Sequence, residues 1–443
     1  MLEGSEAMLI EFEVGNYLSF AEPVALSMLA AKALKDSPDN IRQNPIVGGV
    51  LTSAAIYGAN ASGKSNFFKA VRFARSMILG SSKDTQADEP ISVVPFKLAE
   101  EYGDKPSHFQ FVFGVGSEVY RYGFDADSSQ IHKEWLFLVK KRSEVNLFLR
   151  EFQDITITKA FSEGKGLEPR TRRNALFLSV AAQFNGEIAG RIVEWAWQLT
   201  VLSLSLGATG TRRIPVLRDE ELKGALLHML KQADLGISGL KVEELEFEDA
   251  FGSTEITDLD REKLTAAFGG PKLLTIKAMH TKYRAGQPCG HVEMDFDSEE
   301  SLGTKLFLSL GELILKGLRD GATLFADELD TSLHPLLVLA LVRLFHSHET
   351  NNLGAQLIFS THDTNILSYG GLRRDQVWFM EKKQCQDTDL YSLAEVKQST
   401  GKVRKDASYE KDYLRGRYGA IPYLGDLQNL WEGAAVGKTD KTK

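Results

Sequence analysis

The sequence predicts an α/β fold built around a glycine-rich loop, with an antiparallel β lobe and a helical insertion. Three observations support this prediction. A glycine-rich segment, 58–65, lies between an apolar run and helix-compatible sequence. Two later apolar runs, 321–328 and 356–363, each end in polar residues and flank an amphipathic helical stretch, 335–346. Short runs of β-type residues fill 91–149. Strand–helix–strand order with polar strand ends predicts a parallel sheet whose chemistry lies at its carboxyl edge.

The composition is that of a globular protein with no broad basic surface. At 443 residues the chain exceeds one ordinary core, and 43% hydrophobic with 25% charged residues excludes disorder as the main state. The net charge of −8 argues against an extended nucleic-acid surface but leaves local patches open. Cys289 and Cys385 have no paired spacing, so neither a disulfide framework nor a cysteine zinc site is expected. A reducing, cytoplasmic location suits this pattern.

No membrane segment is expected. The N-terminus lacks a basic region followed by an apolar core, so it does not resemble a signal peptide. The most apolar stretch, 175–199, is interrupted by polar and charged residues and is too polar to span a bilayer.

The first elements in chain order are β-strands over 9–26 and a polar loop over 35–45. The glycine-rich segment follows, in the pattern Gly-x-x-x-x-Gly-Lys-Ser. Its residues are Gly58, Ala59, Asn60, Ala61, Ser62, Gly63, Lys64 and Ser65. Backbone N–H groups converging at a helix N-terminus bind anions, and glycine permits close approach to phosphate. The P-loop interpretation assigns Lys64 to the β- and γ-phosphates of ATP and Ser65 to Mg²⁺. The alternative is a strand–turn–helix with a chance lysine.

An exposed loop is expected over 81–90, and an antiparallel sheet over 91–149. From 174 to 234 the pattern is helical, with a break at 207–213. Residues 242–262 are strongly acidic, and β-type runs return at 273–278 and 291–296. The predicted organisation is an N-terminal core part, 8–170, a helical insertion, 171–234, and a C-terminal core part, 235–443.

The second apolar run ends in Asp327 and Glu328. Asp327 is predicted to join the Mg²⁺ shell, and Glu328 to polarise a water against the γ-phosphate. The alternative is a pair of acids that cap a strand. His362 ends the next strand and is predicted to sense the γ-phosphate, although a lone histidine can also be purely structural.

These segments occur in the order found in ABC-type ATPases, which the chain resembles. The resemblance identifies 58–65 as Walker A, Asp327-Glu328 as Walker B, the segment 329–334 with Asp330 as the D-loop, and His362 as the switch histidine. Lys64 and Asp327 lie 263 residues apart (64 to 327), which resembles the soluble ABC-like ATPases related to SMC and OLD proteins more than transporter ATPases.

A closer resemblance covers nearly the whole chain. The segments that carry it are 95–98, 120–123, 174–179, 300–304 and 413–422. They resemble the AAA family ATPases of bacterial abortive-infection systems, a group that includes the ATPase subunits AriA of PARIS, RloA and AbiLi. The resemblance implies an ATP- and Mg²⁺-dependent sensor subunit of an anti-phage system. It also implies a dimer that sandwiches two ATPs, a toxic nuclease partner encoded nearby, and a phage-derived trigger.

Ser301 and Gly303 occupy the place of the ABC signature, whose helix N-terminus faces the γ-phosphate of a partner subunit. The first signature glycine is missing here. The alternative is an ordinary helix N-cap. Gln356 begins a strand and is interpreted as structural, so the metal-contacting glutamine of ABC sites has no assigned counterpart.

Two other functions compete with this interpretation. A DNA-repair or DNA-end ATPase would grip nucleic acid directly, but the sequence lacks long heptads and is acidic overall. A pseudo-ATPase scaffold would have lost its catalytic acid, whereas Glu328 is present. The stretch 401–419 is locally basic, with six basic residues against three acidic ones. It is either a solvated face or, over 413–422, a docking segment for a partner.

Overall fold

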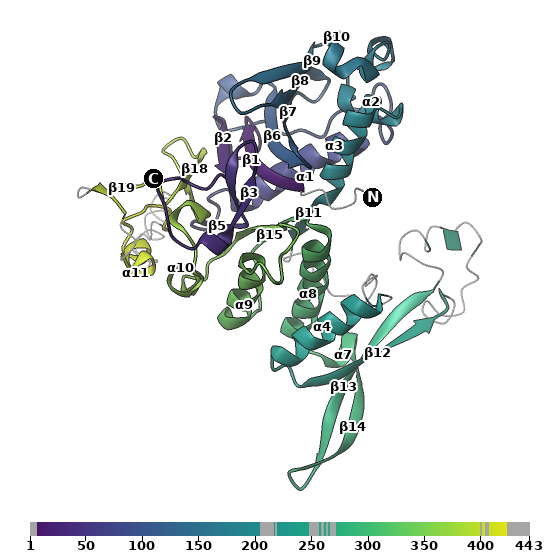
Figure 1. Cartoon of the computed structure of the whole chain (residues 1–443), viewed down its shortest axis with the longest axis vertical. Coiled ribbons are helices and arrows are strands. Elements are labelled where there is room, and N and C mark those ends of the chain that lie inside the picture. The colour runs from purple at the N-terminus through teal and green to yellow at the C-terminus, as the bar shows by residue number, and fades with distance from the viewer. Residues whose placement is uncertain are drawn as a thin grey trace, which may run out of the picture.

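The computed structural model describes residues 7–203, 219–247, 272–398, 401–403 and 407–422, and single residues at 217, 257, 261, 262 and 265. Two sheets form the body of the molecule, and a narrow β-arm projects from it (Figure 1). No helix in these ranges is both long and apolar enough to cross a bilayer.

A seven-stranded sheet forms the predicted antiparallel lobe. Its order is β10-β9-β8-β7-β6-β1-β2. The strands are β1 (Ala7–Gly15), β2 (Val24–Ser27), β6 (Ser107–Val115), β7 (Glu118–Ala126), β8 (Ile131–Val139), β9 (Glu144–Glu151) and β10 (Asp154–Ile157). Along β6, buried and half-buried residues alternate because successive side chains point to opposite faces.

The second sheet carries the parallel strands that the sequence predicts. Its order is β11-β15-β16-β5-β17-β18, and only β18 runs antiparallel to its neighbour. The strands are β5 (Ser53–Tyr57), β11 (Leu199–Ser203), β15 (Thr323–Asp327), β16 (Gln356–Ser360), β17 (Val377–Lys382) and β18 (Thr388–Ser392). β5, β15 and β16 are buried throughout, which explains their continuous apolar sequences.

Helix α1 (Lys64–Gly80) joins the two sheets. The Phe67 ring lies 5.4 Å from that of Phe12 in β1, and the Phe68 ring lies 6.3 Å from that of Phe325 in β15. Helices α8 (Leu302–Asp320) and α9 (Pro335–His346) belong to a second apolar core on the other side of the parallel sheet. The P-loop helix α1 is therefore held against both sheets by aromatic contacts, through Phe67 on the antiparallel sheet and Phe68 on the parallel sheet.

The range 171–234 is not purely helical. It contains α2 (Phe177–Gln183), α3 (Glu187–Gln198) and α4 (Glu220–Gln232), but also β11, which pairs in parallel with β15 as an edge of the core sheet. Because β11 begins at the residue that follows α3, the helical pattern runs directly into this short strand. The expected break at 207–213 lies outside the described residues, as does most of the acidic stretch 242–262.

The remaining elements connect these layers. The segment 35–45, expected as a loop, contains η1 (Pro38–Asn40) and β3 (Ile41–Asn44), which pairs with β4 (Gly48–Leu51). The others are η2 (Glu100–Tyr102), η3 (Lys159–Gly164), η4 (Glu168–Arg170), α10 (Asn365–Tyr369), η7 (Arg374–Gln376), β19 (Lys397–Gln398), β20 (Gly401–Lys402) and α11 (Tyr409–Leu414).

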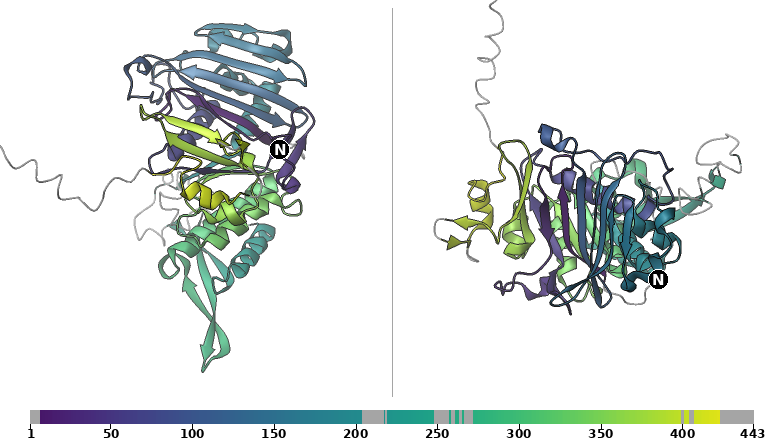
Figure 2. Two further views of the ribbon diagram at one scale, coloured as in Figure 1. Left: turned by 90° about the vertical axis from the view of Figure 1, so that its left-hand side faces the viewer. Right: turned by 90° about the horizontal axis from the view of Figure 1, so that it is seen from above.

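The arm is a three-stranded antiparallel sheet, ordered β12-β13-β14. It comprises β12 (Ile237–Leu245), β13 (Leu273–Arg284) and β14 (Gln287–Asp295), and the short α7 (Phe296–Glu299) leads from it into α8. The left view of Figure 2 shows the arm leaving the body at the end opposite the antiparallel lobe. The two β-type runs at 273–278 and 291–296 thus belong to one long hairpin.

Buried His346 makes the stability of the fold depend on pH. Its Nε2 lies 2.8 Å from Ser53 Oγ, and burial, helped by Arg343 and Arg42, lowers its pKa to about 4. Between pH 6.5 and 4 the unfolded chain therefore binds a proton that the folded chain does not. We expect the free energy of unfolding to fall as pH decreases through this window, by about 3 kcal/mol from this group. Urea unfolding at several pH values measures it, and His346→Gln should flatten the slope. An unchanged slope in that variant would refute the assignment to His346.

Candidate functional site

The glycine-rich loop lies at the carboxyl end of β5 and leads directly into α1. Gly63 caps the helix with φ +111°, and Ala61 also has a positive φ, +61°. Buried Lys64 donates from Nζ to the carbonyl oxygens of Gly58 and Ala59, at 2.7 and 3.1 Å. The ammonium group is thus held inside the curve of the loop, where a phosphate cradle needs it.

Two close approaches explain why the loop needs glycine at both ends. A Cβ at Gly58 would collide with the carbonyl oxygen of Met380, and a Cβ at Gly63 would collide with the side chain of Thr388. Thr388 Oγ1 donates to the carbonyl oxygen of Ser62 and lies within hydrogen-bond distance of Ser19 Oγ, both at 2.9 Å. The loop therefore packs against the turn after β1 and against β17 and β18, and Met380 and Thr388 in these strands follow the loop by more than 300 residues.

The two acids follow from the end of β15. Asp327 is buried and accepts a 2.7 Å hydrogen bond from Ser360 Oγ, which in turn accepts from the backbone N–H of Glu328, also at 2.7 Å. Glu328 is half-buried and has φ +56°, an unfavourable conformation for a residue with a side chain. Such strain is typical of functional sites, where the surroundings hold a side chain in one orientation.

His362 and Asp330 come from neighbouring strand ends. The backbone N–H of His362 donates to Asp330 Oδ2 at 3.2 Å, while Asp330 Oδ1 is buried without a hydrogen-bond partner in the described part of the chain. The D-loop segment and the switch segment are thus tied to each other. Since β16 lies between β5 and β15, His362 emerges between the loop and the acids.

One cavity of about 760 Å³ brings the predicted groups together. It is lined by the segment Asn60–Ser65 and by Glu328 and His362. Its remaining walls are formed by Leu18, Ser19, Asn66, Lys382, Gln386 and the segment Val94–Leu98. The volume is in the range of small-molecule sites. Loop, acid and histidine therefore face one shared space.

The charges in this site influence one another. Burial lowers the pKa of Lys64, and the carboxylates of Asp327, Glu328 and Asp330 oppose that shift. Partial desolvation and the Lys64 ammonium lower the pKa of His362, against the same carboxylates. His362 is therefore neutral at pH 7, and its imidazole can either donate or accept a hydrogen bond.

The oxygen donors suit Mg²⁺. Ser65 is the second residue of α1, and Asp327 supplies a carboxylate at the end of β15. Mg²⁺ in phosphoryl-transfer sites takes one or two protein oxygens and completes its shell with phosphate and water. Within the described ranges, no group of three or more histidine, cysteine or carboxylate side chains is placed to hold a metal ion.

Ser301 and Gly303 lie elsewhere and do not line this cavity. Ser301 is the N-cap of α8, with Oγ accepting from Thr304 N at 3.1 Å, as the N-cap alternative expects. A Cβ at Gly303 would lie 2.9 Å from the carbonyl oxygen of Ser332, so the start of α8 contacts the D-loop segment. A site in which this N-terminus faces a nucleotide requires a second copy of the chain.

Several residues of the site were not predicted from the sequence. Ser360 was noted only as part of a strand end, yet it bridges Asp327 and Glu328. Its position two residues before His362 was the available signal. Thr388, Lys382 and Gln386 carry no local motif. Gln356 is structural, as interpreted, because its amide bonds Leu9, Leu51 and Thr323 in the core.

The aromatic residues of the C-terminal segment 413–422 pack against the core of their own chain. The Tyr413 ring lies 5.6 Å from Tyr57, the residue before the P-loop, and 5.4 Å from Phe379. Buried Tyr418 lies 5.8 Å from Phe379, and Arg417 pairs with Asp412 of its own chain at 2.8 Å. These rings pack inside the molecule, whereas Leu414 and Arg415 of the same segment are exposed, so docking of a partner by 413–422 stays a prediction.

A family model and a solved structure are similar to this chain. A family model described as "AAA domain, putative AbiEii toxin, Type IV TA system" matches residues 53–368, which is well over half of the chain and includes the glycine-rich loop, Glu328 and His362. No curated protein matches. Among solved structures, a crystal structure of the Smc head bound to the C-winged helix domain of ScpA is similar. It has 14% sequence identity and a TM-score of 0.40, and the match covers 87% of this chain and 97% of that chain.

Proposed function

Because the chain belongs to the family of AAA domains described for AbiEii-type toxins of type IV TA systems, we propose that it binds and hydrolyses ATP to control a toxic partner. The observation that carries this proposal is the shared cavity. Lys64, Glu328 and His362 reach it from three adjacent strand ends. Glu328 would orient and polarise the attacking water, and Lys64 would stabilise charge on the phosphates.

ATP is the proposed substrate, and Mg²⁺ would be held by Ser65 and Asp327. Mg²⁺ supplies electrostatic stabilisation of the phosphoryl oxygens when it is bound. Ser360 holds Asp327 and the backbone of Glu328 in fixed positions, so the two acids keep separate tasks. Neutral His362 would complete the wall beside the γ-phosphate, and Asp330 anchors its backbone.

The proposed assembly is a dimer. Ser301 and Gly303 of one subunit would meet nucleotide held by the other, because they do not reach the cavity of their own chain. The biological role proposed is that of a cytoplasmic sensor subunit in an anti-phage, abortive-infection system. It would restrain a nuclease toxin encoded nearby and respond to a phage-derived trigger.

Co-purification tests this role. The full chain is expressed with the product of the neighbouring gene, and the mass of the complex is measured with no nucleotide, with MgATP and with ADP. We expect a stable complex that contains at least two copies of this chain and whose composition changes with MgATP but not with ADP. A chain that purifies alone under all three conditions would exclude control of that neighbour.

A further inference from the structure

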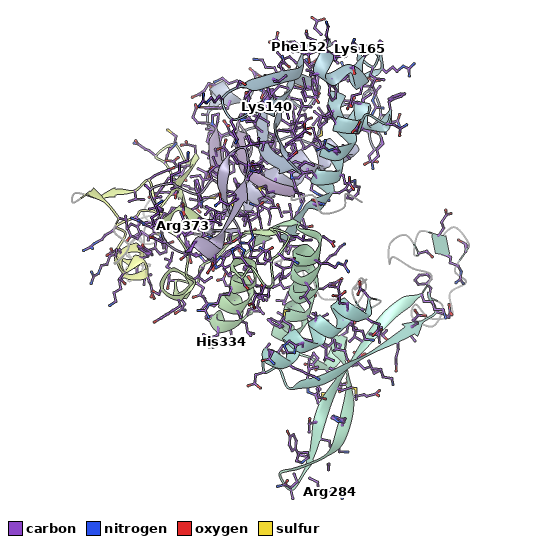
Figure 3. The ribbon with its side chains drawn as sticks, viewed as in Figure 1. Lys140, Phe152, Lys165, Arg284, His334 and Arg373 are labelled. Carbon is purple, nitrogen blue, oxygen red and sulfur yellow. The ribbon has the colours of Figure 1, made fainter. Side chains whose placement is uncertain are left out.

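The β13–β14 hairpin extends far beyond the apolar core of the arm. Every residue from Lys282 to Glu293 is exposed, so this part of the hairpin has no buried face. Arg284 marks its end, remote from the body, in Figure 3. The tip turns through Ala285 and Gly286, both with positive φ, +50° and +80°, as a two-residue hairpin loop requires. A ribbon that buries so little contributes little to folding stability, which makes a binding role the better explanation for its length.

The charge of this hairpin differs from that of the chain. No aspartate or glutamate occurs from His280 to Val292, although acids outnumber Lys and Arg by 60 to 52 overall. Nearer the base, Lys241 pairs with Glu293 at 3.1 Å and Lys272 with Glu246 at 2.8 Å. By contrast, no ion pair within the described ranges engages Lys282 or Arg284. The hairpin tip, residues 282–290, therefore presents uncompensated positive charge.

The chemistry of the tip favours a polyanion over a protein surface. Stable protein interfaces rely on several apolar or aromatic anchors that become buried together. The tip offers one, Tyr283, which is 62% exposed, among small and polar neighbours. Lys282 and Arg284 are two residues apart on β13 and so share one face of the ribbon. Two cations on one face of a narrow ribbon suit successive phosphates of a nucleic-acid backbone.

We propose that the hairpin tip binds double-stranded DNA through Lys282 and Arg284. The major groove of B-form DNA admits a two-stranded antiparallel ribbon, whereas that of A-form RNA is too narrow. The contact requires no nucleotide and no nuclease partner. It is therefore independent of the proposed ATPase role, and either idea can fail without the other.

Fluorescence anisotropy with a short labelled duplex tests the proposal. The full chain is titrated without ATP between about 50 and 200 mM salt. The test variant is Lys282→Ala with Arg284→Ala. Its matched control is Lys140→Ala with Lys165→Ala, which removes the same charge from exposed residues at the opposite end of the molecule (Figure 3).

We expect the tip variant to bind DNA about tenfold more weakly at the lowest salt, and its logarithmic salt slope to fall by about 2, since each lost phosphate contact removes about one unit. The control variant should bind like wild type. All substituted residues are exposed, so circular dichroism should show unchanged folding. Absence of DNA binding by the wild-type chain, equal affinities for wild type and tip variant, or equal losses in both double variants would each overturn the proposal.

Discussion

Lys64→Ala abolishes measurable ATP binding while the chain remains folded. The side chain supplies the positive charge inside the loop, and its Nζ also ties together the carbonyl oxygens of Gly58 and Ala59. Charge-assisted hydrogen bonds to phosphate are among the strongest polar contacts in proteins. Loss of both roles should lower the ATP affinity by at least about a hundredfold, or ~2.8 kcal/mol.

Isothermal titration calorimetry of the purified variant measures this effect. Lys69→Ala is the matched control. Lys69 lies on the same helix, but it is exposed and does not line the cavity. The control should bind ATP like wild type. Equal affinity of the Lys64→Ala variant and the wild type would show that the loop is a structural turn and not a phosphate cradle.

Glu328→Gln keeps ATP bound but slows hydrolysis by about 10²-fold or more. The amide preserves the size and hydrogen bonding of the side chain, but it cannot accept a proton from water as a carboxylate can. The hydrogen bond from the Glu328 backbone N–H to Ser360 Oγ involves no atom of the Glu328 side chain, so the strand end should keep its shape. The variant should therefore accumulate as an ATP-bound dimer or larger assembly.

Phosphate release and the mass of the ATP-loaded variant are the two readouts. Glu349→Gln, at an exposed position beyond α9, removes a carboxylate without touching the cavity and should leave the rate unchanged. A Glu328→Gln rate within about twofold of wild type would exclude Glu328 as the general base. Slow hydrolysis with reduced ATP affinity would instead indicate that the carboxylate mainly supports binding.

The sequence predicted those parts of the site that lie in contiguous segments. The spacing of glycine, lysine and serine in Gly58–Ser65 has a physical reason at each position. The runs that end at Asp327 and His362 are apolar because their strands are buried on both faces. The antiparallel order of β6 to β10 was equally predictable, since these strands follow one another along the chain, whereas β1 and β2 join the same sheet from the N-terminal end of the sequence.

Contacts between distant segments could not be predicted in this way. Thr388 stabilises the loop through Ser62 from 326 residues away, and nothing in its own neighbourhood indicates that role. β11 joins the core sheet although it follows directly on α3, because pairing with β15 outweighs local periodicity. The packing of Tyr413 on Tyr57 likewise depends on the tertiary fold.

A structure of the Glu328→Gln chain with ATP and Mg²⁺ tests most directly whether 58–65, Asp327-Glu328 and His362 form one nucleotide site. We predict that the triphosphate lies in the cavity above α1, with Lys64 at the β- and γ-phosphates, and with Ser65 and Asp327 next to the metal. We also predict that Ser301 of a second subunit closes the site. Density for ATP away from the loop, or no bound ATP at saturating concentration, would contradict the proposed ATPase site.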